Sequence, residues 1–170
     1  MVVTLKNEKC TVKCQQEGAM LHSLVKDDIE YLWQGDKSYW GGQAPVCFPI
    51  VGVLKNGAAK AFGKECSMAR HGVARINPFE IKEQGANFVT FVQISTEETK
   101  KQFPFDYRLE IKYTLNGDTV TTEYTVLNIG DSSLPFAIGG HPAFNCPLCD
   151  DEAFEDYSVK FDKVLTYNKS

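Results

Sequence analysis

His141 is the residue whose setting most clearly suggests chemistry. It lies in the stretch PFAIGGHPAFN at residues 135–145, directly after Gly139 and Gly140 and before Pro142. An imidazole titrates near neutral pH, so it can donate a proton and recover it within one reaction cycle. The two glycines are expected to let a ligand approach the ring. A glycine pair is also typical of a bulge or tight bend, and a packed core histidine is the alternative interpretation.

A second histidine, His71, is also followed by a glycine and is flanked by Arg70 and Arg75. Its alternative interpretation is an ordinary surface histidine. Both histidines lie in stretches without strand periodicity, one at residues 35–75 and the other around His141. Long ordered loops on a rigid scaffold often carry functional sites.

The cysteines give little support to a metal site. Cys146 and Cys149 form one CxxC motif, which is half of a zinc site or a redox pair. A zinc site needs two more ligands, and the sequence has no second such motif. No metal is expected, and the six thiols are expected to be reduced, several of them in the core: Cys10, Cys14, Cys47, Cys66, Cys146 and Cys149.

Alternating polarity predicts the elements that must position these side chains. Apolar and polar residues alternate at 107–115 and again at 120–126, with Asn116 and Gly117 between them, which predicts an antiparallel hairpin around an Asn-Gly turn. Ser95 and Glu98 predict a capping box and one short helical turn. Further strands are expected at residues 10–15, 19–25, 29–33, 79–83, 88–95 and 157–165.

Composition and charge limit the possible functions. With 170 residues, 43% of them hydrophobic, the chain is expected to form a single all-β domain over residues 1–170, an antiparallel sandwich or barrel. A net charge of -4 gives no reason to expect nucleic acid. The longest apolar run, residues 44–54, is too short to cross a membrane. Lys6, Glu8 and Lys9 interrupt any signal peptide, so a soluble cytoplasmic protein is expected.

Three segments together resemble a known family. FPIVGVLKNG at 48–57, HGVAR at 71–75 and PFAIGGHPAFN at 135–145 are similar to the ordered motifs of the aldose 1-epimerase (galactose mutarotase) family. The similarity is greatest to the mutarotase-like branch associated with lactose gene clusters, and it covers essentially the whole chain. It implies a large antiparallel β-sandwich with a sugar-binding cleft on one face.

The resemblance also implies a reaction, the interconversion of the α and β anomers of a free aldose. A base removes the anomeric hydroxyl proton while an acid protonates the ring oxygen, the ring opens, and it closes again after rotation. His141 would be the general acid and His71 a second catalytic imidazole that binds and polarises the same region. The implied ligand is a neutral aldose such as galactose or glucose, with no cofactor, and the implied sugar-binding residues are Arg75, Lys55 and Asn56.

Two departures from the family pattern alter these expectations. Val53 stands where the branch usually carries an arginine, which makes a phosphorylated hexose a less expected ligand. Family members are also longer, and their catalytic glutamate and a sugar-binding aspartate come from a later segment. The chain is therefore expected to be the N-terminal portion of a sandwich left incomplete at its C-terminus. Open sheet edges should promote self-association, and the chain alone should be weak or inactive.

Three alternatives remain open. The acidic residues Asp150, Asp151 and Glu152 could replace the missing base, but such a run is usually a solvated loop. A non-catalytic carbohydrate-binding module would keep the cleft and need no base. A structural β-sandwich would need exposed apolar faces, to which three aromatic residues could contribute, although aromatic rings also stack on sugars: Trp33, Tyr39 and Trp40.

Overall fold

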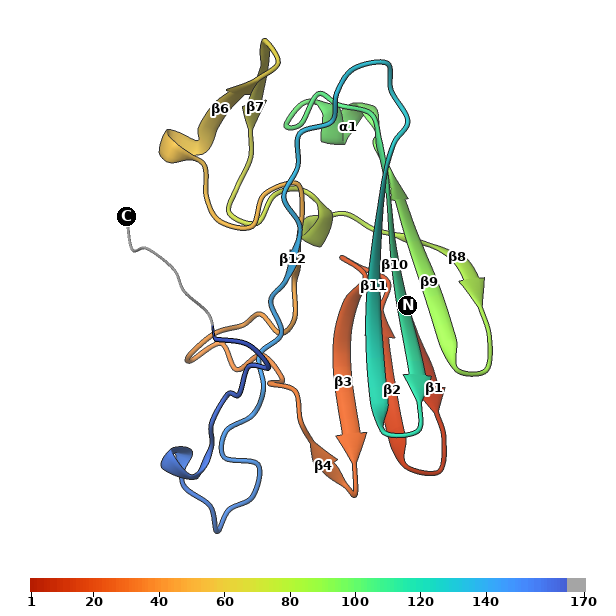
Figure 1. Ribbon diagram of the computed structural model, residues 1–170, viewed down its shortest axis with the longest axis vertical. Coiled ribbons are helices and arrows are strands. Elements are labelled where there is room, and N and C mark those ends of the chain that lie inside the picture. Colours follow the sequence, from red (N-terminus) through yellow and green to blue (C-terminus); the bar gives the residue numbers. More distant parts are fainter. Residues whose placement is uncertain (165–170) are drawn as a thin grey trace.

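Two four-stranded antiparallel sheets make up most of the computed structural model, which describes residues 1–164 (Figure 1). The first sheet has the order β1-β2-β3-β4 and the second β11-β10-β9-β8. The strands of the first sheet are β1 (Val2–Lys6), β2 (Cys10–Gln15), β3 (Met20–Lys26) and β4 (Ile29–Glu30). Those of the second are β8 (Glu80–Gln84), β9 (Phe88–Ile94), β10 (Tyr107–Asn116) and β11 (Thr119–Asn128).

Side-chain alternation explains why the two sheets face each other. Every second residue of β10 is buried, from Tyr107 to Leu115, and the inner residues of β1 and β2, such as Leu5 and Val12, join the same core cluster. The hydroxyl of Tyr113 crosses between the layers and donates to the carbonyl oxygen of Ala19 at 2.8 Å. The expected antiparallel sandwich is confirmed, and the strands do not close into a barrel.

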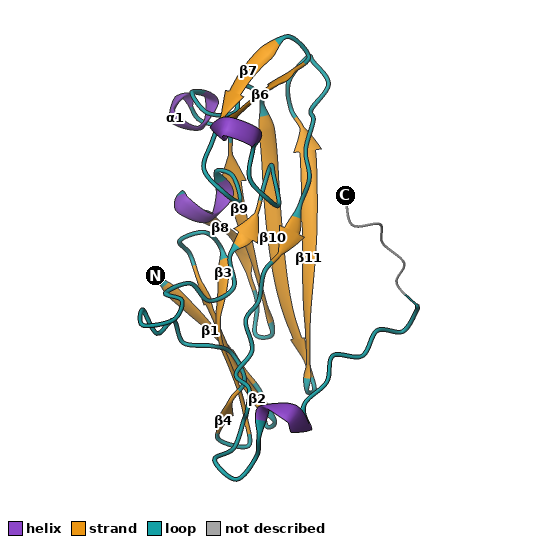
Figure 2. Ribbon diagram, turned by 90° about the vertical axis from the view of Figure 1, so that its left-hand side faces the viewer, coloured by secondary structure: helices purple, strands orange, loops and turns teal. Residues whose placement is uncertain are grey.

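Smaller elements lie outside these sheets. Two short ladders pair β5 (Val46–Cys47) with β12 (Gly139–Gly140) and β6 (Ala58–Ala61) with β7 (Lys64–Ser67). Single turns of 3-10 helix occur at η1 (Lys55–Gly57), η2 (Ala74–Ile76) and η3 (Phe154–Asp156). After β12 the chain leaves the two sheets and runs outside them (Figure 2). Among the described residues, no helix is long and apolar enough to span a membrane.

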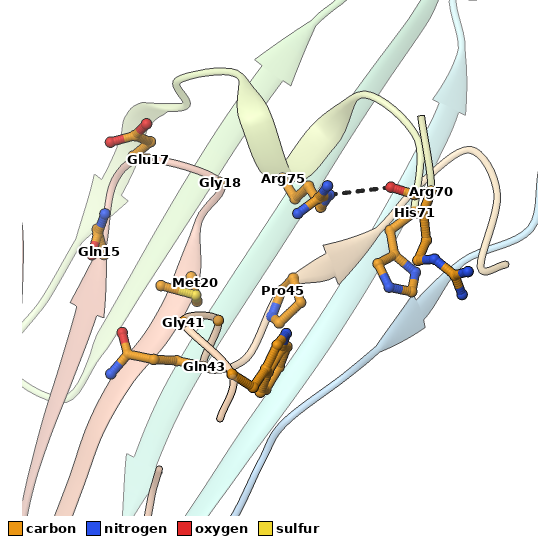
Figure 3. Close-up of a pocket in the computed structure, with 12 residues that line it drawn as sticks. Gln15, Glu17, Gly18, Met20, Gly41, Gln43, Pro45, Arg70, His71 and Arg75 are labelled. Carbon is orange, nitrogen blue, oxygen red and sulfur yellow. Dashed lines mark hydrogen bonds between the residues drawn. The ribbon is translucent and has the colours of Figure 1, made fainter. Parts of the chain in front are cut away.

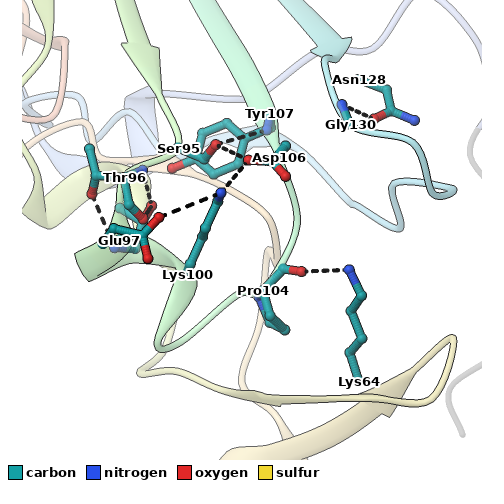
Figure 4. A network of polar contacts seen from close by, with 11 residues as sticks. Lys64, Ser95, Thr96, Glu97, Lys100, Pro104, Asp106, Tyr107, Asn128 and Gly130 are labelled. Atoms are coloured by element: carbon teal, nitrogen blue, oxygen red, sulfur yellow. Dashed lines mark hydrogen bonds and ion pairs between the residues drawn. The ribbon is translucent and has the colours of Figure 1, made fainter.

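Two predicted turns are displaced by one residue. Asn116 pairs with Thr119, so the hairpin loop consists of Gly117 and Asp118 rather than Asn116 and Gly117. The helix α1 (Glu97–Lys100) is capped by Thr96, not by Ser95, because Thr96 and Thr99 exchange side-chain and backbone hydrogen bonds. The Ser95 hydroxyl instead contacts Asp106, which forms an ion pair with Lys100 at 2.6 Å (Figure 4).

Other strand predictions need larger corrections. The stretch 35–75 contains β5, β6 and β7, and β1 precedes the first predicted strand. The strand predicted at 29–33 is reduced to β4 and an isolated bridge from Leu32 to Phe144. No strand forms at residues 157–164, where the chain has left the sheets, and residue 165 lies outside the described residues.

Candidate functional site

The backbone around Phe48 brings the two histidines together. On one side, the Phe48 N–H donates to the His71 carbonyl at 3.1 Å, and the Val73 N–H donates to the Phe48 carbonyl at 2.8 Å. On the other side, β5 pairs with β12, and the His141 N–H donates to the Pro45 carbonyl at 3.1 Å. The three sequence motifs are therefore hydrogen-bonded neighbours, with the FPIVG segment in the middle.

The His71 and His141 rings lie side by side, with centroids 5.4 Å apart and planes inclined by 59°. His71 Nδ1 lies 2.5 Å from the carbonyl oxygen of Val51, which can only accept, so Nδ1 carries the proton and donates it. Nε2 of His71 is left for another partner. Among the described residues, the His141 side chain makes no hydrogen bond, and its ring packs on Trp40 at 5.3 Å.

The glycines beside the histidines allow close packing of neighbouring protein atoms. Gly72 has a φ of +75°, and a Cβ built on it would lie 2.3 Å from the carbonyl oxygen of Phe48. A Cβ on Gly140 would lie 2.8 Å from the hydroxyl of Tyr124, and one on Gly139 would meet Val51 at 3.3 Å. The expectation that Gly139 and Gly140 leave room for a ligand is therefore wrong, because protein atoms occupy that space.

His71 opens onto a cavity of about 580 Å³, a volume within the range of small-molecule sites (Figure 3). Arg70 and Arg75 line the same cavity, and Arg75 Nε donates to the Arg70 carbonyl at 3.2 Å. Glu17 is the only carboxylate among the described lining residues, and it lies across the cavity from His71. The full lining is Gln15, Glu17, Gly18, Met20, Trp40, Gly41, Gly42, Gln43, Pro45, Arg70, His71 and Arg75.

The predicted site residues are distributed unevenly around this cavity. His71 and Arg75 line it, whereas His141 lines a smaller depression of about 200 Å³ and packs against His71 and Trp40, which both line the large cavity. Lys55 and Asn56 lie in the exposed turn η1 and are not part of the lining. The structure thus groups three of the five predicted residues.

Sequence reasoning missed most of the polar lining. Gln43 is buried, its side-chain oxygen accepts from His22 Nδ1 at 2.8 Å, and its amide nitrogen donates to the Trp33 carbonyl at 3.3 Å. Gln15 is the last residue of β2 and Glu17 lies two residues beyond it, and tertiary folding brings both to the cavity. The GGQ triplet after Trp40 was the one available signal, since two glycines expose the backbone before a polar residue.

Cys47, on β5, is a buried thiol close to the site. Burial raises the pKa of the Cys47 thiol, and the positive charge of Arg75 offsets this only in part, so Cys47 remains a neutral thiol. Four cysteines are buried, as expected for core thiols. Asp150, Asp151 and Glu152 are exposed outside the cavity lining, which confirms the solvated-loop interpretation.

Comparisons with known proteins bear on the family of the chain. The family model for aldose 1-epimerase matches residues 1–170. The plasmid-encoded protein LacX of Lactococcus lactis subsp. lactis is 42% identical over 171 residues, covering 96% of this chain and 57% of the relative. The chromosomal LacX protein of the same organism is 41% identical with the same coverage.

Solved structures show the same fold. A galactose mutarotase related enzyme from Lactobacillus acidophilus has a TM-score of 0.88 and 35% identity, covering 92% of this chain and 53% of that one. A galactose mutarotase-like protein from Lactobacillus casei has a TM-score of 0.84 and 38% identity, covering 89% and 52%. The chain thus spans little more than half the length of the relatives it matches.

Proposed function

The chain belongs to the aldose 1-epimerase family, and on that basis we propose that it binds a free aldose and supplies the general acid for mutarotation. The observation that carries the proposal is the adjacent pair of imidazoles, His71 and His141, of which His71 lines a cavity large enough for a monosaccharide. Two neighbouring imidazoles provide one group to orient a sugar and one to transfer a proton to it.

In the proposed mechanism, His141 protonates the ring oxygen of the sugar as the ring opens, and takes the proton back as it closes. Neither of its ring nitrogens is hydrogen-bonded within the described residues, so one can turn to a sugar oxygen. His71 is restricted to Nε2, because its Nδ1 donates to Val51. A neutral His71 therefore accepts from a sugar hydroxyl and a protonated one donates, which suits binding and polarisation next to the acid.

The proposed ligand is a neutral aldose such as galactose or glucose. Arg75 lines the cavity and can donate to sugar hydroxyls. Val53 is 59% exposed and supplies no cation where the family branch usually carries one, which argues against a phosphorylated sugar. Lys55 and Asn56, in the next turn of the same loop, remain proposed binding residues that would need the loop to close toward the ligand.

The mechanism also needs a base that removes the proton of the anomeric hydroxyl group. Within the described residues, no carboxylate forms an ion pair or hydrogen bond with either imidazole. We propose that the base is a glutamate from the part of longer mutarotases that lies outside the matched segment. Glu17, the carboxylate across the cavity, is the alternative within this chain. The second candidate function is that of a carbohydrate-binding module, which needs no base. It is favoured by the lack of a carboxylate bonded to either imidazole among the described residues.

Polarimetry of freshly dissolved α-galactose and α-glucose tests the proposal. The samples are this chain, its Glu17→Gln variant, and a longer protein in which the same residues are followed by the remaining part of a family mutarotase. Because removing a positioned base costs a factor of about 100 to 10,000, strong acceleration is expected only in the longer protein. Full activity of the chain, lost in Glu17→Gln, would make Glu17 the base. A longer protein that binds sugar without acceleration would establish the binding module instead.

A further inference from the structure

Trp40 and His71 are the two aromatic side chains that pack against the imidazole of His141 among the described residues. The two rings lie 5.3 Å apart at an inclination of 48°, within the usual range for packed aromatic rings. His71 is fixed by its bond to Val51, but His141 has no such side-chain hydrogen bond among the described residues. The orientation of the His141 ring thus depends on its packing against Trp40 and His71.

The loop that carries Trp40 is hydrogen-bonded at both ends to the segment that carries His141. The Trp33 N–H donates to the Ala143 carbonyl at 3.0 Å, and the Ala143 N–H donates to the Gln43 carbonyl at 2.9 Å. Ala143 lies two residues after His141. The loop at residues 34–42 therefore begins and ends beside Ala143, close to His141 in the chain.

Within the loop, the backbone of Trp40 is held at both its donor and its acceptor. The carbonyl of Asp36 accepts from the Trp40 N–H at 2.8 Å, and the Asp36 side chain accepts from the Ser38 N–H at 2.8 Å. The indole N–H of Trp33 donates to the Trp40 carbonyl at 2.7 Å. These hydrogen bonds fix the backbone from which the indole of Trp40 projects.

Gly42 makes room for that indole. A Cβ on Gly42 would lie 2.5 Å from Cζ2 and 2.6 Å from Cε2 of Trp40, closer than real contacts allow. Any larger residue at this position would push the indole away from its present place. The hydrogen-bonded backbone of the loop and the absence of a side chain at Gly42 together allow the indole to pack against His141.

We propose that Trp40 is a positioning residue that acts through His141, holding its imidazole beside His71. This inference rests on the proposed function for what the imidazole does, but the positioning itself is independent of activity. Trp40 also lines the large cavity, so direct stacking of its indole on the sugar is the competing explanation.

NMR of the histidine side chains provides the test, because the chain has only 3 histidines and gives a simple spectrum. Imidazole resonances are compared in the wild-type chain, Trp40→Ala, Trp40→Phe and Gly42→Ala, with circular dichroism to check folding. In Trp40→Ala, the His141 proton signals are expected to shift, because the indole ring current is lost, and to broaden, because the imidazole is no longer held in one orientation. Trp40→Phe should restore the narrow lines, and Gly42→Ala should reproduce the shift with the indole still present.

Tyr39→Ala is the matched control, because Tyr39 is 84% exposed and packs against Trp33 rather than His141. Its His141 resonances should match the wild type. His141 lines that stay as narrow in Trp40→Ala as in the wild type, with galactose affinity lost, would overturn the proposal in favour of stacking on the sugar. If Trp40→Ala does not fold, Trp40→Phe and Gly42→Ala decide the question. A Trp40-dependent His141 line width, together with a longer protein that binds galactose without accelerating mutarotation, would overturn the proposed function and leave the positioning intact.

Discussion

Gly72 lies so close to Phe48 that a Cβ on it would come within 2.3 Å of the Phe48 carbonyl oxygen. This contact connects two of the three motifs that resemble the family, because the Val73 and Ala74 N–H groups donate to the same carbonyl. His71 comes directly before Gly72 and itself has a positive φ of 69°. The location of the first imidazole is thus decided by backbone packing one residue away.

Gly72→Ala should therefore destabilise the fold severely, by about 3 kcal/mol or more, since it adds a clash with Phe48 to an unfavourable φ. Gly57→Ala is the matched control, because Gly57 has a φ of +72° with no atom within 4 Å of the added methyl group. Its cost should be about 1 kcal/mol. Urea unfolding measures both, and equal costs would show that the contact with Phe48 adds nothing.

Self-association is expected along β11. This ten-residue strand pairs only with β10 among the described residues, which leaves its other edge open. Thr121→Lys should shift the chain toward a monomer in size-exclusion chromatography with light scattering, since edge lysines disfavour strand pairing. The same substitution at Thr4 of β1, the edge of the other sheet, is the control. Association that responds to Thr4→Lys and not to Thr121→Lys would place the contact elsewhere.

Stability should fall in acid through Glu110. Its hydrogen bond to Lys82, and after that the charge of Arg108, hold its pKa below the ordinary value of 4.5. A carboxyl group with a lowered pKa in the folded state stabilises the protein above the pKa of the unfolded state, and this contribution is lost as pH falls through the folded pKa. Below about pH 4.5 the wild type should therefore lose more unfolding free energy than Glu110→Gln. Parallel losses in the two proteins, measured by urea unfolding at pH 7 and pH 3.5, would contradict this role.

The alternation of apolar and polar residues made the strands β10 and β11 predictable from the sequence. The residues of β10 alternate without exception between buried and half-buried positions until the last, and the sequence pattern shows this directly. The strands β5 and β12 could not be found in this way, since each has two residues and β12 consists of glycines. They form because Phe48 and its neighbours bring distant segments together. The predicted terminal strand failed because alternation there has no sheet to join.

Candidate site residues could be predicted from the sequence only where a reactive residue type stood in an unusual local sequence. His71 and His141 each stand next to glycine in an irregular segment, and this setting identified both. Glu17 and Gln43 have no comparable local signal, because the folded arrangement of β2 and of the Trp40 loop brings them to the cavity. The glycines that drew attention to the histidines are explained by packing against Phe48 and Tyr124. The setting thus drew attention to two histidines whose rings lie side by side in the structure, although the glycines next to them are explained by packing.

The most direct test of the account is a double-mutant cycle on sugar affinity. NMR titration with galactose gives the dissociation constant of the wild type, His71→Gln, His141→Gln and the double variant. If one sugar contacts both imidazoles, each single variant should bind about 10-fold more weakly. The double variant should lose less than the product of the two losses, since the rings lie 5.4 Å apart and share a ligand. Wild-type affinity in either single variant would contradict the claim that His71 and His141 form one sugar site.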